Sequence, residues 1–139
     1  MDANELANRV ARAMLAGEGT GPAWGIEIEE AREAYVRLSM VVRANMLNSH
    51  GIAHGGMIFA LADTAFAYVC NGANHASVAA QASIVFLDKV KESETLVAEA
   101  EEVAREGRAG VTRVVVRTAD GRTVAEFTGY SRTIGGTVI

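Results

Sequence analysis

One carboxylate stands out in this sequence because its neighbours are almost all apolar. Asp63 lies within Gly56–Cys70, where it is the one charged residue and has no lysine or arginine beside it to pair with. An isolated carboxylate in apolar surroundings is costly to ionise, and such groups cluster at functional sites. The position predicts a nucleophile or a general base. The alternative is that Asp63 faces a gap filled by solvent, or pairs with an arginine from elsewhere.

A second candidate precedes this segment, at His54-Gly55-Gly56. The first N–H groups of a helix have no partner within the helix, and the helix dipole favours negative charge there. Two glycines allow a ligand to approach the backbone closely. The pattern predicts an oxyanion hole built from main-chain amides, with a plain turn into the helix as the alternative.

The spacing between these two candidates has a structural consequence. Eight residues separate Gly55 from Asp63, which is a rise of about 12 Å along a helix. That distance is too long for both groups of one chain to hold a single reacting carbon. We therefore expect Gly55 of one chain to act with Asp63 of another in an obligate dimer, in which a two-fold axis provides the arrangement twice.

Three other residue types could contribute chemistry. His50 and His54 are four residues apart, but they precede the helix and have no third ligand, so we predict no metal site. Asn48 offers an amide that can position a water or a carbonyl, or can form a turn. Cys70 has no histidine nearby to activate it, and we expect it to be inert packing.

The elements that must position these groups follow from hydrophobic periodicity. The segment Gly56–Cys70 is apolar on all sides, which is typical of a buried helix. A first helix over Ala3–Leu15 is expected to be capped by Asn4. The strands are expected at residues 24–29, 35–42, 77–87, 95–106, 111–117 and 123–133. The strand at Ser77–Leu87 is mostly apolar on both faces, as in a central strand, and Asp120-Gly121 is a strong hairpin signal.

Runs of strands joined by short turns favour an α+β fold, with an antiparallel sheet curled around the buried helix. The length of 139 residues predicts one domain over 1–139, with the first helix at 1–16 included. A net charge of -4 argues against a nucleic-acid partner. A single cysteine, no leader pattern and no bilayer-length apolar run predict a cytoplasmic protein without membrane contact.

The stretch from His50 to Tyr68 closely resembles the PaaI-type hotdog-fold acyl-CoA thioesterases of the phenylacetate pathway, and the similarity extends over nearly the whole chain. In that family a sheet wraps the central helix, and subunits pair into dimers and then tetramers. The resemblance implies that Asp63 is the catalytic acid, Gly55 the backbone donor to the thioester carbonyl, and Asn48 and His54 the loop residues of the site. It implies no cofactor, because coenzyme A is part of the substrate.

The resemblance also implies substrate contacts for Gly56 and for Thr64, which matches a hydroxyl residue after the family's acid. One departure concerns the strand after the helix, where relatives carry a hydroxyl or polar residue and this chain has Ala79, Ala80 and Gln81. Gln81 or Ser83 is expected to take a supporting role. The implied acyl groups are aromatic, of the phenylacetyl or hydroxyphenylacetyl type.

Two other functions remain open from the sequence. A hotdog hydratase or dehydratase needs a histidine and a carboxylate at one carbon. A non-catalytic acyl-CoA-binding protein would tolerate loss of the acid. The family's residues that meet the coenzyme A phosphates vary, and the basic residues near strand ends are candidates without an assignment: Lys89, Lys91, Arg108 and Arg132.

Overall fold

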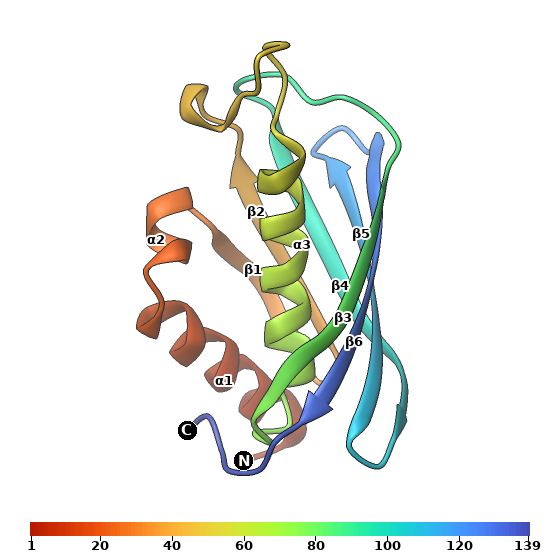
Figure 1. The fold of residues 1–139 in the computed structure, drawn as a ribbon. Helices are drawn as coiled ribbons and strands as arrows, with labels where there is room; N and C mark the ends of the chain where they lie inside the picture. The colour runs from red at the N-terminus through yellow and green to blue at the C-terminus, as the bar shows by residue number, and fades with distance from the viewer.

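A six-stranded antiparallel sheet forms the larger part of the molecule. The computed structural model describes residues 1–139, and the strand order is β1-β2-β4-β5-β6-β3. The strands are β1 (Glu27–Arg32), β2 (Tyr35–Val41), β3 (Ser77–Phe86), β4 (Thr95–Glu106), β5 (Ala109–Thr118) and β6 (Thr123–Thr133). Figure 1 shows the sheet curving behind one long helix. The predicted α+β fold, with a sheet wrapped around a central helix, is confirmed.

The helices lie together on one face of the sheet. They are α1 (Ala3–Gly17), α2 (Thr20–Trp24), the 3-10 turn η1 (Ala44–Met46) and the central α3 (Gly55–Cys70). In Figure 1, α1 and α2 lie beside α3 and leave its front uncovered. No helix is both long enough and apolar enough to cross a membrane.

The packing of α3 on the sheet fixes where its polar residue points. Leu61, Ala65 and Phe66 are buried against the strands. Phe66 lies so close to β6 that a Cβ atom on Gly129 would be 2.7 Å from its ring. Phe59 and Asp63 are only half-buried. The expectation that α3 is buried on all sides is therefore wrong for the single chain, because no element covers the front of the helix.

The two ends of α3 are fixed by side chains. His54 caps the start of the helix, where its ring accepts a hydrogen bond from Gly56 N–H. At the other end, the Asn71 side chain accepts from Ser77 N–H (2.8 Å) and donates to Ala67 O (2.8 Å). Asn71 thus connects the end of α3 to the first residue of β3 and sets how the strand leaves the helix.

Several element boundaries differ from those predicted. Asp2, not Asn4, caps α1 by accepting a hydrogen bond from Glu5 N–H, while the Asn4 side chain accepts from the N–H of Glu33. Trp24, predicted to begin a strand, ends the short helix α2, because the chain turns at Gly25 with φ of 66°. The central helix begins at Gly55, one residue earlier than predicted.

The position of β3 is the largest correction. We predicted a central strand, but β3 pairs only with β6 and forms an edge of the sheet. Its outward residues are exposed, among them Val85 at 58% and Val78 at 47%. The apolar pattern was read as burial on two faces, whereas in the single chain one face and one edge of β3 are uncovered. A long apolar edge strand of this kind is usually covered by a partner.

Candidate active site

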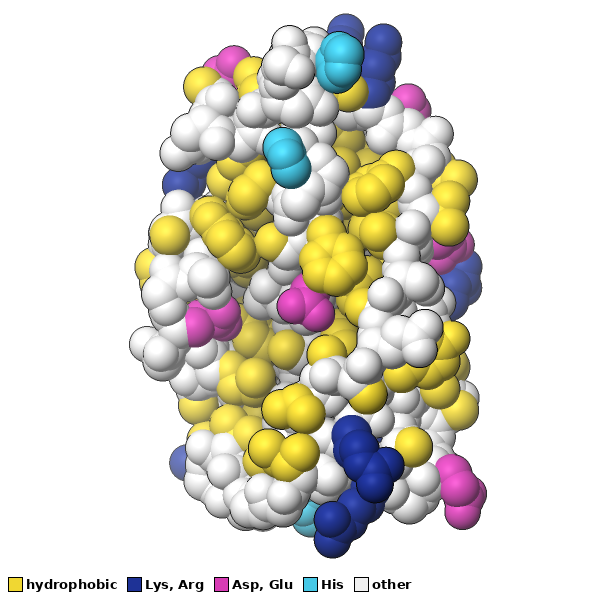
Figure 2. Space-filling model, viewed as in Figure 1, with side chains coloured by type: hydrophobic (Ala, Val, Ile, Leu, Met, Phe, Trp, Pro, Cys, Tyr) yellow, Lys and Arg dark blue, Asp and Glu magenta, His cyan; other side chains and the backbone are white.

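Asp63 faces a cleft between the central helix and the two N-terminal helices. The cleft has a volume of about 470 Å³, and its lining includes Asp63, Thr64 and Tyr68 from α3 and Met14 and Trp24 from the N-terminal segment. Figure 2 shows this uncovered side of the molecule, where hydrophobic side chains gather over the helix and an acidic side chain lies near the centre. The cleft is large enough for a small organic group.

The carboxylate of Asp63 has no partner in the chain. Burial is the one cause that raises its pKa above the usual 3.8, with no contribution from a hydrogen bond or a nearby charge. The structure therefore contains no arginine that pairs with Asp63, which excludes that alternative. A desolvated carboxylate without a partner is a stronger base than one in water, which suits a general base or a nucleophile.

The start of α3 presents one free main-chain donor. Gly56 N–H is already bonded to His54 Nδ1 at 2.8 Å. Met57 N–H and Ile58 N–H both donate to His54 O. Gly55 N–H, by contrast, donates to no acceptor in the chain. The predicted donor at Gly55 is thus available, whereas Gly56 has no N–H to offer a substrate and its predicted role is reduced to leaving space.

The His54 cap also fixes the state of the imidazole ring. Because Nδ1 accepts the hydrogen bond from Gly56 N–H, the neutral ring carries its proton on Nε2. His54 is exposed, so this Nε2–H group is free to donate to a bound molecule. His54 lies at the same helix end as the Gly55 N–H.

Asn48 combines the two roles that the sequence left open. Its Oδ1 accepts from His50 N–H (2.9 Å) and Ile52 N–H (3.3 Å), which shapes the loop before α3. Its Nδ2 group makes no hydrogen bond in the chain, and Asn48 lines a second cavity of about 370 Å³ together with Gly55 and Phe86. The turn thereby leaves the Nδ2 donor unbonded in a residue that lines the same cavity as Gly55.

The two halves of the predicted site lie in different cavities of the chain. Gly55 and Asn48 line the cavity near Phe86, whereas Asp63 lines the cleft under α1 and α2. The intervening rise along α3 is about 12 Å. A single chain therefore does not bring Gly55 and Asp63 to one reacting carbon.

The remaining predicted site residues, Thr64, Gln81 and Ser83, make no hydrogen bond to Asp63. The Thr64 hydroxyl is buried and donates to Ala60 O at 2.7 Å. Ala82 and Ile84 of β3 pack toward the core. Because side chains alternate along a strand, Gln81 and Ser83 lie on the opposite face of the sheet, where they are exposed. The sheet separates them from the Asp63 of their own chain.

Sequence reasoning missed the far side of the Asp63 cleft. Glu18 lines the cleft and accepts a hydrogen bond from the Tyr68 hydroxyl, fifty residues further along the chain. Burial, followed by the contact with Glu18, raises the pKa of Tyr68. Tyr68 was considered only as part of the apolar helix Gly56–Cys70. Neither residue had a local signal, because five residues along a helix turn Tyr68 about 140° away from Asp63 and Glu18 lies before the short helix α2.

Cys70 takes no part in this arrangement, and the chain holds no group of metal ligands around His50 and His54. Cys70 is buried, and desolvation is the main cause that raises its pKa to about 12, so the thiol is a poor nucleophile at neutral pH. No three histidine, cysteine or acidic side chains lie close enough together to bind a metal ion.

The fold and the two half-sites define a hotdog-type thioesterase arrangement, and comparison with known proteins agrees. Residues 50–125 match the model of the thioesterase superfamily. This chain belongs to that superfamily and is an enzyme of the thioester hydrolase class.

Individual relatives show more specifically which members of the superfamily this chain resembles. The chain is 40% identical over 128 residues to the acyl-coenzyme A thioesterase PaaI of Escherichia coli K12, covering 92% of this chain and 91% of the relative. The solved structure of E. coli PaaI, from the phenylacetic acid degradation operon, matches with a TM-score of 0.96 and 38% identity, over 98% of this chain and 99% of that chain. A hypothetical thioesterase from Streptococcus pneumoniae TIGR4, solved with coenzyme A, matches with a TM-score of 0.78 and 29% identity, over 81% and 90% of the two chains.

Proposed function

We propose that this protein hydrolyses acyl-CoA thioesters to the free acid and coenzyme A. The observation that carries the proposal is the unpaired Gly55 N–H at the start of α3, because every neighbouring amide of that helix end is already bonded. Two findings support acyl-CoA as the substrate class. The E. coli relative is named an acyl-coenzyme A thioesterase, and the streptococcal relative was solved with coenzyme A.

In the proposed mechanism the thioester carbonyl oxygen accepts a hydrogen bond from Gly55 N–H. His54 Nε2–H and Asn48 Nδ2 are further donors within reach of the same helix end. Asp63 of a second subunit then attacks the carbonyl carbon, or takes a proton from a water that does. The negative charge that develops on the oxygen is stabilised by the donors and the helix dipole. Collapse of the tetrahedral intermediate breaks the C–S bond and releases the coenzyme A thiolate. On the general-base route the acid is then free, whereas on the nucleophilic route an anhydride of the acyl group with Asp63 remains, and water hydrolyses it to the free acid and the Asp63 carboxylate.

The second subunit is proposed to pair along β3. This strand has one free edge, and Val85, Phe86 and Leu87 near its end are more than half exposed. Pairing of two such edges across a two-fold axis would cover the apolar strand and bring Asp63 of each chain toward Gly55 of the other. Further pairing of dimers into a tetramer, as the family resemblance implies, is part of the same proposal.

The acyl group is proposed to be aromatic and to enter the Asp63 cleft. Trp24 and Met14 provide apolar parts of the lining, and the hydrogen-bonded pair Tyr68 and Glu18 lines the same cleft. At about 470 Å³ the cleft accepts an aryl ring, whereas a long straight chain would have to leave it. A kcat/KM higher for phenylacetyl-CoA and hydroxyphenylacetyl-CoA than for long-chain acyl-CoAs would support this choice, and the reverse order would exclude it.

The function is tested by measuring free thiol release from a panel of acyl-CoAs, by the wild type and by Asp63→Asn. We expect release by the wild type and a loss of about a thousandfold or more in kcat for the variant, which keeps the size of the side chain but cannot act as a base. Hydration of enoyl-CoA without thiol release would instead identify a hydratase. Binding without any turnover would identify a binding protein.

The shared site has a separate test by subunit mixing. Asp63→Asn and Gly55→Pro chains are each expected to be inactive, but hybrid dimers keep one site with both groups intact. After random exchange of subunits we expect recovery of about one quarter of the wild-type activity. Recovery that stays at zero, although exchange is verified by mass spectrometry, would contradict a site shared between chains. Sedimentation should show no monomer at micromolar concentration.

A further inference from the structure

A second carboxylate lines the cleft that contains Asp63. Glu18 directly follows α1 and is half-buried in the lining of this cleft. Two hydroxyl groups hold its side chain, because Oε1 accepts a hydrogen bond from Tyr68 and Oε2 accepts one from Thr20 (2.6 Å). Since Tyr68 belongs to the central helix and Thr20 begins α2, these bonds fix the carboxylate between the elements that form the cleft.

No positive charge in the cleft balances these two acids. The lining contains Glu18 and Asp63 but no lysine, arginine or histidine. Neither acid takes part in any ion pair of the chain. The other four large cavities each have at least one lysine or arginine in their lining. The Asp63 cleft therefore differs from them in that its charged side chains are all acidic.

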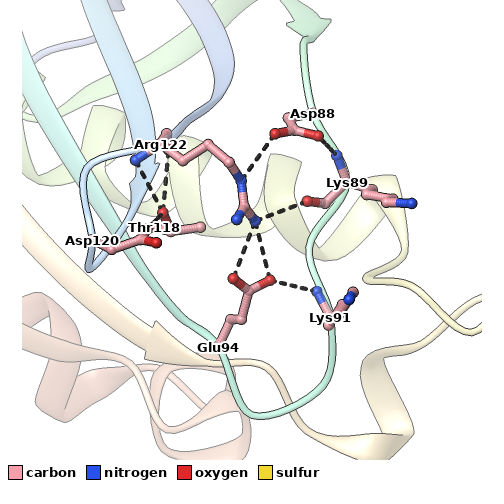
Figure 3. Close-up of polar contacts among 7 residues, drawn as sticks. All are labelled: Asp88, Lys89, Lys91, Glu94, Thr118, Asp120 and Arg122. Atoms are coloured by element: carbon pink, nitrogen blue, oxygen red, sulfur yellow. Dashed lines mark hydrogen bonds and ion pairs between the residues drawn. The ribbon is translucent and has the colours of Figure 1, made fainter.

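The cavity next to Arg122 shows how the chain balances acids elsewhere. Arg122 pairs with Asp88 (2.9 Å) and with Glu94 (3.1 Å), and Figure 3 shows the guanidinium group between the two carboxylates. The hydroxyl partners of Glu18 fix its position but leave its negative charge in place. In a partly desolvated cleft such a charge acts strongly on any charged group that enters.

The hydroxyl groups of the cleft have no hydrogen left to offer a bound anion. Those of Tyr68 and Thr20 donate to Glu18. The Thr64 hydroxyl donates to a main-chain carbonyl of its own helix at 2.7 Å. Among the side chains of the lining, this leaves the indole N–H of Trp24 as a donor without an acceptor. An anionic group would exchange its water shell for a single N–H donor, which is unfavourable.

We propose that Glu18 is a specificity-determining residue, which excludes acyl groups that carry a negative charge at the end remote from the thioester. The inference rests on the acyl-CoA thioesterase function proposed above, with the acyl group in the Asp63 cleft. Tyr68, which holds Glu18, lies five residues after Asp63, a rise of about 7.5 Å along the helix. Glu18 therefore meets the far part of an acyl group whose carbonyl carbon is at Asp63. A carboxylate there would be opposed by a like charge without a neutralising cation.

The test compares two acyl groups of equal size on coenzyme A, 4-carboxyphenylacetyl and 4-carbamoylphenylacetyl, which differ in charge. We expect the wild type to have a kcat/KM about tenfold or more higher for the carbamoyl ester, and Glu18→Gln to bring the ratio of the two close to one. Glu106→Gln is the matched control, because Glu106 is exposed, lies outside the cleft and loses the same charge. Its ratio should equal that of the wild type. Adipoyl-CoA and its monoamide give the same comparison without an aromatic ring.

Tyr68→Phe distinguishes the charge of Glu18 from a merely structural role of the pair. This variant removes the hydrogen bond between the two residues but keeps the negative charge. We therefore expect its ratio to stay within about threefold of the wild-type ratio. Equal hydrolysis of the charged and the neutral ester by the wild type would overturn the proposal and leave the thioesterase function standing. A ratio that falls equally in Tyr68→Phe and Glu18→Gln would also overturn it.

A binding measurement keeps the two proposals separable. If no acyl-CoA releases thiol, the proposed function fails, but coenzyme A thioethers that carry the same two end groups still report on Glu18, because they bind without being hydrolysed. Calorimetry should show tighter binding of the carbamoyl thioether by the wild type and equal binding of both by Glu18→Gln. Equal binding of both thioethers by the wild type would refute the role of Glu18.

Discussion

The role proposed for Gly55 depends on a single N–H group, and the chain allows that group to be removed with little other change. Gly55 is the first residue of α3, the helical position where proline is best tolerated. The preceding residue, His54, has φ of -63° and ψ of 133°, which is the extended conformation that a following proline requires. Gly55→Pro therefore deletes the donor while the helix start keeps its geometry.

The matched control is Gly55→Ala, which adds a Cβ atom but keeps the N–H. That Cβ would lie 3.1 Å from the end of the Phe86 ring, and Phe86 is half-exposed, so the ring can shift by the few tenths of an ångström required. Both variants share this contact, and their difference isolates the hydrogen bond. Loss of one oxyanion-hole donor lowers kcat by about 100-fold to 1,000-fold. We expect that ratio between Gly55→Ala and Gly55→Pro.

The assay is thiol release at saturating acyl-CoA, together with thermal unfolding and sedimentation to show that both variants fold and associate as the wild type does. A proline variant that retains activity within about threefold of the alanine variant would refute the reasoning. In that case His54 or Asn48 would have to bind the thioester carbonyl. The Gly55 N–H group would then no longer be assigned as a donor of the oxyanion hole.

Three further predictions concern stability. Burial raises the pKa of the Asp63 carboxyl group above 3.8, so this group stays protonated to a higher pH in the folded than in the unfolded state. The stability of the wild type therefore falls as the pH rises from the unfolded-state pKa through the folded-state pKa. Urea unfolding should show that Asp63→Asn is more stable than the wild type at pH 7 but not below pH 3.8. Thr112 has a fully buried hydroxyl without a partner, so Thr112→Val should raise the free energy of unfolding by about 1 kcal/mol, and a decrease would mean that the hydroxyl is bonded. Gly129→Ala places a Cβ atom 2.7 Å from the Phe66 ring, which should cost about 1–3 kcal/mol, with partial rescue by Phe66→Leu.

Much of the fold could be predicted because local patterns determine it. The central helix was placed to within one residue, since its apolar run is bounded by a glycine pair and by Asn71. The β5–β6 hairpin followed from Asp120-Gly121, and the alternation in Thr95–Glu106 correctly located β4. These signals depend on residues that are close in sequence, and no knowledge of the tertiary structure was required.

The errors share one physical origin, which is contact between distant parts of the chain. The Glu18–Tyr68 hydrogen bond joins residues from separate helices, so no local period could indicate it. Trp24 belongs to a helical turn because of the left-handed backbone at Gly25, although its alternation with Ile26 suggested a strand. The supporting role expected of Gln81 and Ser83 stays a prediction from the resemblance, because in the single chain both residues are exposed on β3.

The apolar pattern of β3 has a further meaning, because it predicts a burial that the single chain does not provide. A strand that is apolar on both faces predicts cover on both faces, and the single chain leaves much of it exposed. The same chain keeps its free donor at Gly55 and its unpaired carboxylate at Asp63 in different cavities. A second copy along β3 would resolve both features at once, since it would cover the strand and complete the site. Subunit association and catalysis would then depend on the same edge, so any variant that separates the subunits should lose activity even though each chain still contains every catalytic group.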